Sequence, residues 1–163
     1  MTAPNWNLES ILPGGIVGAP YQTAVQTLRD ELDALVQKTS ALPPLPEGME
    51  GFSESLQALY ALSTRTGPVS LLAHCYTCDN TRDRNAQNES STVRSLWSRY
   101  QLAWIPLSDQ LAHCTEESFE ALLAQPELAL MRPALERMRA QAPLMLPRAE
   151  QALATQLLSL IHI

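Results

Sequence analysis

The sequence contains no stretch close to the roughly 20 consecutive apolar residues that a membrane-spanning helix needs. Its first ten residues, MTAPNWNLES, also lack the basic and apolar regions of an export signal. Cysteine is scarce, and the odd number of three favours reduced thiols over a disulfide framework. These absences predict a cytoplasmic protein with no membrane partner.

Basic clusters are missing as well, apart from Arg82 and Arg84. The formal net charge is −6 and the pI is about 5.0, whereas a surface that follows phosphates is basic. We therefore expect no nucleic-acid partner. The sequence also has no H-E-x-x-H, no G-x-S-x-G and no glycine-rich phosphate loop, so it predicts no catalytic, cofactor-binding or metal-ligating residue within this chain.

Residues that favour strands are few: Val and Ile number 10, whereas Leu and Ala number 47. This balance favours helices. A length of 163 residues with 45% apolar content is enough for one globular domain with a buried core. We predict an all-α fold, an antiparallel bundle of about six helices, several of them bounded or kinked by proline.

The first half of the chain predicts two helical segments, and the second of them is expected in two parts. The first begins at Pro20, runs for about 20 residues with Ala24, Leu28, Leu32 and Leu35 on its apolar face, and ends before ALPPLPEGMEG, where prolines and glycines prevent continuation. The second begins near Ser53 and is predicted to carry an apolar stripe of Leu56, Leu59, Tyr60 and Leu62. It breaks at Gly67-Pro68 and resumes through VSLLAHCYTC. The polar run DNTRDRNAQNESS is predicted as a turn.

The second half predicts four more features. A long apolar face begins at Val93, and Pro106 is expected to kink its helix. Thr115 is expected to cap a short helix that begins with two acids. Pro126 and Pro147 are expected to begin the last two helices, because proline fits the first turn.

The segment HCYTC is the most suggestive cluster for metal or thiol chemistry. Cys75 and Cys78 lie three residues apart, and His113 with Cys114 could approach from a neighbouring helix. A closed zinc site needs four such ligands. Helical spacing instead favours both thiols as small buried hydrophobic groups beside two leucines, and a thiol or metal sensor is the third-ranked hypothesis.

An aromatic stripe follows the long helix at helical spacing. Its members are Trp97, Tyr100 and Trp104. The stripe could stack a ligand, but this spacing is more typical of a packed core. We expect core residues here.

The opening WNLESILP resembles the W-[DN]-L-x-x-[LFY]-[FL]-P start of the oligoendopeptidase F family, zinc metallopeptidases related to thimet oligopeptidase. The matching residues are Trp6, Asn7, Leu8, Ile11, Leu12 and Pro13. The run NTRDRNA resembles the family's D-T-x-D-x-x-A with Asn80, Thr81, Asp83 and Ala86, although Asn80 replaces an Asp. A later helix pair is similar at Leu135, Arg139, Pro143, Leu146, Glu150 and Leu153, with Pro147 in place of the usual Ser.

The resemblance covers roughly residues 4 to 158 and implies the N-terminal helical lobe of a longer enzyme. In that family the lobe walls a deep channel, and the zinc ligands lie several hundred residues later. It implies a parent that uses zinc to hydrolyse internal bonds of short peptides. Residues 1–163 are then a truncated front piece that lacks its C-terminal catalytic domain, holds no zinc of its own and is inactive alone.

The chain closes on ATQLLSLIHI, which is apolar and has no helix-ending signal. We expect a helix cut before its natural end. Residues 158 to 163, LSLIHI, resemble the translation of a transposase adapter sequence and are a candidate non-native tail. The alternative function is a self-contained helical-bundle interaction module with no enzymatic activity, whose exposed apolar end holds a partner.

Overall fold

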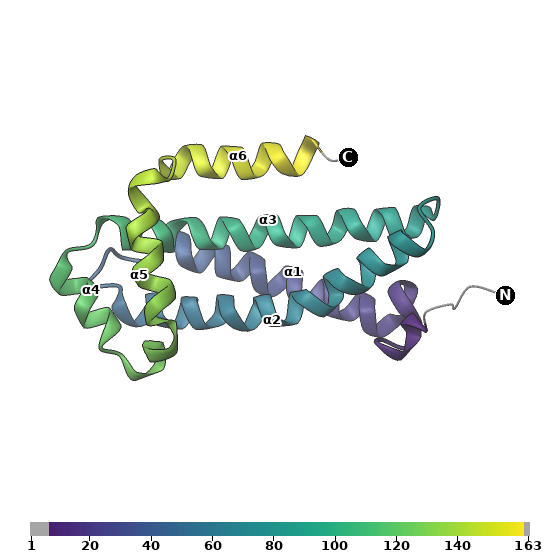
Figure 1. Cartoon of the computed structure of the whole chain (residues 1–163), viewed down its shortest axis with the longest axis horizontal. Coiled ribbons are helices and arrows are strands. Elements are labelled where there is room, and N and C mark those ends of the chain that lie inside the picture. The colour runs from purple at the N-terminus through teal and green to yellow at the C-terminus, as the bar shows by residue number, and fades with distance from the viewer. Residues whose placement is uncertain (1–6, 162–163) are drawn as a thin grey trace.

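The structure is a computed structural model that describes residues 7–161, and every regular element in that range is helical (Figure 1). The α-helices are α1 (Ala19–Ser40), α2 (Met49–Asp79), α3 (Arg84–His113), α4 (Glu116–Leu123), α5 (Arg132–Gln141) and α6 (Arg148–Ile161). Short 3₁₀ helices span Leu8–Ser10, Gly15–Val17, Pro126–Met131 and Ala142–Leu144. The all-α prediction is confirmed.

Helices α1, α2 and α3 form the body of the molecule, and each runs antiparallel to the one before it (Figure 1). Helix α3 is the central element, because it packs against α1, α2, α5 and α6. Helix α6 lies antiparallel along α3, on the side away from α2 (Figure 1). Helices α4 and α5 lie at one end of the bundle, where α5 crosses the long helices.

The core follows the expected helical periodicity. In α1 the buried residues recur at steps of three and four, and Leu28, Leu32 and Leu35 are buried as predicted. In α2 the predicted stripe is right for three leucines but wrong for Tyr60, which is 66% exposed. The fully buried large side chains are Tyr21, Phe52, Leu28, Leu32, Leu59, Leu72, Leu96, Leu107, Leu111, Leu122, Leu128 and Leu135.

The predicted break at Gly67-Pro68 is wrong, because α2 continues through both residues. Pro68 is exposed, so the carbonyl that loses its helical donor can bind water instead. Gly67 has no Cβ to meet the proline ring, which relieves the usual restriction on the residue before proline. Figure 1 shows α2 changing direction in its second half rather than ending.

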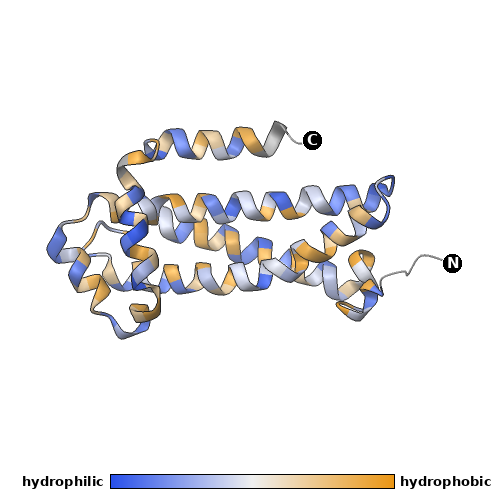
Figure 2. Ribbon diagram, in the orientation of Figure 1, coloured by the Kyte–Doolittle hydropathy of each residue, from blue (hydrophilic) through white to orange (hydrophobic). Residues whose placement is uncertain are grey.

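The predicted polar turn is mostly helix. Only the residues before Arg84 form a turn, and α3 then runs through the rest of the polar run. The cause is Asp83, whose carboxylate accepts hydrogen bonds from the backbone N–H groups of Asn85 (2.8 Å) and Ala86 (3.5 Å). This cap lets polar residues begin the helix on the solvent side, where Figure 2 shows a strongly hydrophilic stretch.

The remaining predicted boundaries agree with the structure at two sites and differ at two. Thr115 caps α4 by accepting a hydrogen bond from the Ser118 backbone N–H at 3.2 Å. Helix α6 begins directly after Pro147. Pro126 begins a 3₁₀ helix rather than an α-helix. Pro106 lies inside α3, and Figure 1 shows α3 as one continuous helix without a visible bend, so the predicted kink is not seen.

Within residues 7–161, no helix is long and apolar enough to cross a membrane.

Candidate ligand pocket

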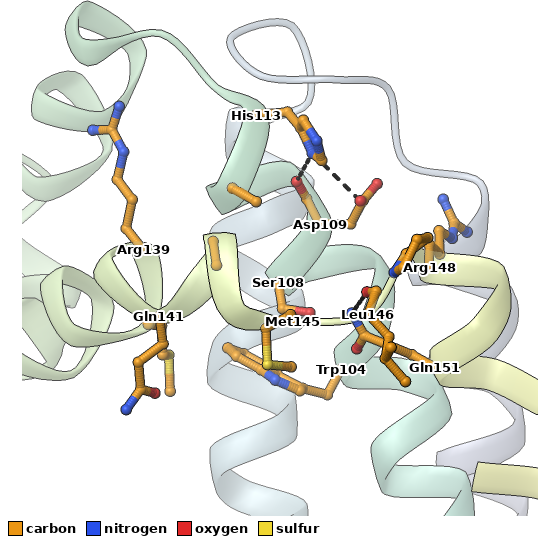
Figure 3. Close-up of a pocket in the computed structure, with 14 residues that line it drawn as sticks. Trp104, Ser108, Asp109, His113, Arg139, Gln141, Met145, Leu146, Arg148 and Gln151 are labelled. Carbon is orange, nitrogen blue, oxygen red and sulfur yellow. Dashed lines mark hydrogen bonds and ion pairs between the residues drawn. The ribbon is translucent and has the colours of Figure 1, made fainter. Parts of the chain in front are cut away.

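A pocket of about 630 Å³ lies where the end of α3 meets α5 and the start of α6 (Figure 3). This volume is within the range of small-molecule sites. The connection from α5 to α6 runs past the pocket through Leu144, Met145 and Leu146, whose side chains are 87%, 49% and 55% exposed. Its lining residues are Trp104, Ser108, Asp109, Ala112, His113, Met138, Arg139, Gln141, Ala142, Met145, Leu146, Pro147, Arg148 and Gln151.

The floor of the pocket is apolar. Trp104 and Met138 are half-buried and pack against the core, so they form a fixed surface. Met145 and Leu146 lie beside Trp104 in Figure 3 and are about half exposed, at 49% and 55%. The pocket can therefore accept an apolar group against the indole ring.

The polar side chains of the pocket are mostly engaged with one another or with the backbone. His113 Nδ1 lies 2.8 Å from the Asp109 carbonyl oxygen and 3.4 Å from Asp109 Oδ1. The Ser108 hydroxyl donates to the Ile105 carbonyl at 2.9 Å. Because Ser108 and His113 are each committed elsewhere, they do not form a nucleophile and base pair.

Two arginines bring positive charge to the pocket. Arg139 is held by Glu116 (3.1 Å), by the Cys114 carbonyl (3.2 Å) and by the Phe119 ring, whose centroid is 4.3 Å from the guanidinium carbon. Arg148 is exposed and makes no hydrogen bond or ion pair to any described residue. Among the described residues that line the pocket, an apolar floor thus lies beside one cation, Arg148, that has no ion pair.

Sequence reasoning missed this pocket, but Arg148 carried a signal. Arg148 occupies the first turn of α6, where the helix dipole disfavours a positive charge. The proximity of Asp109 and Met145 to Arg148 depends on the path between α5 and α6, and periodicity does not predict it.

The HCYTC segment does not form the closed zinc site considered above. Cys75 and Cys78 lie near the end of α2, whereas His113 and Cys114 lie at the far end of α3. The C-terminal ends of α2 and α3 lie at opposite ends of the bundle because the two helices are antiparallel. Among residues 7–161, no three His, Cys, Asp or Glu side chains are placed to hold a metal ion.

The expected burial of both thiols in HCYTC is wrong. Cys75 is half-buried and packs against the core, but Cys78 is exposed, as is Leu71 at 57%. Leu72 is fully buried, so the buried face of α2 passes through Leu72 and Ala73 and leaves Cys78 at the solvent edge. The third thiol, Cys114, is half-buried, and burial raises its pKa above the ordinary value.

The aromatic stripe of α3 lies at the edge of the core. Trp97, Tyr100 and Trp104 are all half-buried and pack against it. The rings of Trp97 and Tyr100 meet edge to face with centroids 5.5 Å apart, and burial raises the pKa of Tyr100. Only Trp104 lines the pocket, so the ligand-stacking alternative applies to this residue alone.

The residues that carry the family resemblance fall into two groups. Leu8, Ala86 and Leu135 are buried, and Asp83 caps α3. Glu150 and Leu153, by contrast, are exposed, while Trp6 lies outside the described residues. Comparisons of the chain with protein-family models, with curated proteins and with solved structures find no match.

Proposed function

We propose that this chain is the N-terminal helical lobe of a zinc metalloendopeptidase that hydrolyses internal bonds of short peptides. The observation that carries the proposal is where the resembling residues lie. Leu8 is 9% exposed, Ala86 and Leu135 are 0% exposed, and Asp83 supplies the cap of α3. These three core positions and one helix cap coincide with the resemblance, whereas other resembling residues, among them Asn7, Ile11, Pro13, Thr81 and Leu146, are exposed.

The turn between α2 and α3 supports the proposal even at Asn80, the position where this sequence differs from the family motif. Asn80 replaces the usual Asp, yet its side-chain oxygen accepts a hydrogen bond from the Arg82 backbone N–H at 3.1 Å. Its carbonyl accepts a second one from the Asp83 N–H at 3.0 Å. Asparagine therefore performs the same turn-forming task as aspartate.

In this proposal, zinc-dependent peptide hydrolysis is carried out by a domain outside this chain. Peptide hydrolysis of this type needs a metal-activated water, two histidines one helical turn apart and a glutamate as base. The lobe would contribute selection by size, because a walled channel admits an extended peptide and excludes a folded domain. The pocket at Trp104 and Arg148 offers an apolar surface and a cation to such a peptide.

Helix α6 supplies the surface on which the missing domain would pack. Its leucines recur along one side, visible as repeated hydrophobic bands in Figure 2, and Leu153, Leu157 and Leu158 are 55%, 49% and 60% exposed. A soluble monomer rarely leaves such a face uncovered. In the proposed parent this face is buried against the catalytic domain.

The test compares this chain with the full-length parent on a short internally quenched peptide. We expect chelator-sensitive cleavage by the parent and none by the chain alone. In the parent, Arg148→Gln should raise KM for short peptides with little change in kcat, because Arg148 contacts no reacting atom. Chelator-sensitive turnover by residues 1–163 alone would contradict the proposal.

The same α6 face favours the second candidate function, an interaction module without activity. In that case the chain alone should form a defined dimer, or hold a partner helix, through Leu153 and Leu157. Light scattering of the wild type and of Leu153→Gln/Leu157→Gln separates the two functions. A wild-type dimer that the double substitution converts to a folded monomer favours the module.

A further inference from the structure

His74 and Cys78 form an exposed pair on the last turns of α2. They lie four positions apart in the sequence, so both side chains lie on the same side of the helix. His74 Nε2 lies 3.5 Å from Cys78 Sγ, and both residues are exposed. The proposed peptidase function makes no use of this pair.

The spacing of the two atoms matches a metal chelate. In tetrahedral zinc sites the Zn–S distance is about 2.3 Å and the Zn–N distance about 2.0–2.1 Å, which places the two ligand atoms about 3.6 Å apart. Sγ and Nε2 are already at this separation. An ion could therefore bind both atoms with little rearrangement of either side chain.

We propose that His74 and Cys78 form a two-residue chelate for zinc or another thiophilic divalent ion. Thiolate and imidazole are both ligands that zinc accepts, whereas magnesium and calcium prefer oxygen. Binding transfers the thiol proton to solvent and forms the metal–sulfur bond, with no change of oxidation state. Water completes the coordination, so the ion is exchangeable.

This site differs from the closed four-ligand zinc site, whose candidate ligands lie at opposite ends of the bundle, and from the proposed catalytic zinc of the parent. It uses one thiol of HCYTC together with the histidine, not the two thiols. Cys75 is half-buried against the core and is the less accessible thiol. The inference stands whether or not the chain belongs to a peptidase.

Metal binding here has a predictable structural consequence. The chelate links the last two turns of α2, just before Asn80 begins the turn to α3. It therefore adds a constraint at a helix end, where the backbone frays most easily. An ion that binds only the folded chain raises its stability by mass action.

The test is a cadmium titration of the reduced protein, followed by the ultraviolet charge-transfer band of the cadmium–thiolate bond. We expect a saturable band at one ion per chain, with zinc displacing cadmium. Cys78→Ser should abolish the saturable band, and His74→Gln should weaken binding by about tenfold or more. Cys75→Ser, the matched control on the same helix, should bind like the wild type.

Zinc-dependent thermal stability supplies the second readout. Zinc should raise Tm for the wild type and for Cys75→Ser, but not for His74→Gln or Cys78→Ser. Because both proposed ligands are exposed, all the variants should keep the helical circular dichroism of the wild type. Wild-type affinity in His74→Gln, or loss of binding in Cys75→Ser, would overturn the chelate.

Discussion

At the scale of single residues, Arg139 does more than its ion pair suggests. Its side chain is 22% exposed, whereas that of Glu116 is 76% exposed, so their charge pair is strongly screened. The contacts with the Phe119 ring and the Cys114 carbonyl are better protected from solvent. These contacts hold α4 against α5.

We therefore predict that Arg139→Met, which keeps an apolar stem, lowers the free energy of unfolding by about 1–2 kcal/mol. Glu116→Gln removes only the exposed partner and should cost less than about 0.5 kcal/mol. Urea denaturation of both variants measures the difference. Equal losses for the two substitutions would show that the ion pair dominates.

Tyr21 poses a different question, because its ring is fully buried and its hydroxyl makes no well-formed hydrogen bond to a described residue, although the Glu89 carboxylate lies close enough to affect it. Burial, and then the charge of Glu89, raises the pKa of Tyr21. The unfolded chain deprotonates this tyrosine near its ordinary value of 10.0, while the folded chain does not. Stability is therefore lost as the pH rises above about 10.

Tyr21→Phe should leave the free energy of unfolding at pH 7 unchanged or raise it by up to about 1 kcal/mol, because it removes an unsatisfied hydroxyl. It should also reduce the loss of stability in alkaline solution. Denaturation at several pH values tests both effects, with Tyr100→Phe as the half-buried control. A cost above about 1.5 kcal/mol at pH 7 would mean that the hydroxyl donates to Glu89 in solution.

Residue-level reasoning succeeded where local chemistry decides the outcome. The Thr115 cap and the core leucines of α1 follow from hydroxyl geometry and helical period, and both are confirmed. It failed at Cys78 and Tyr60, because exposure at the edge of an apolar stripe depends on the rotation of the helix against its neighbours. A sequence pattern does not specify that rotation to within one residue.

At the scale of elements, the start of α3 depends on Asp83. Asp83→Ala should lower the free energy of unfolding by about 1 kcal/mol, because two backbone N–H groups lose their acceptor. Asp83→Asn keeps an acceptor oxygen and should cost only a few tenths of that. Thermal or urea denaturation measures both losses. An Asp83→Ala variant as stable as the wild type would show that the Asp83 cap does not stabilise the start of α3.

Helix α6 should be the least protected long element of the bundle. It packs mainly on α3, and several of its leucines are about half exposed. Amide hydrogen exchange should therefore be faster in residues 148–161 than in the middle of α1 or α3. Strong protection of α6 in the isolated chain would favour a complete native bundle and weaken the proposal of a missing domain.

Element boundaries were predictable where proline or a cap sits at a helix start, as at Pro147 and Thr115. They were not predictable where a later interaction overrides a breaker. Pro68 suggested an end, yet α2 continues, because the rest of that helix buries apolar residues such as Val69 and Leu72. Packing of a long apolar face outweighs the loss of one hydrogen bond.

At the scale of the whole molecule, composition was enough for the class of fold, since leucine and alanine far exceed valine and isoleucine. The arrangement was harder to predict. The crossing of α5 and the pocket beside α6 depend on a short connection whose residues, Leu144 to Pro147, have no periodicity to interpret. The candidate site was missed for that reason, while the absence of a nucleophile motif was visible from the start.

At this scale we propose that the bundle is the peptide-selecting lobe of a zinc peptidase, with its α6 face covered by the catalytic domain. The most direct measurement is the codon sequence that follows Leu157 in the natural gene. We expect several hundred further codons that encode an H-E-x-x-H motif and a downstream glutamate. A stop codon close behind, or a long continuation without a histidine pair at that spacing, would contradict it.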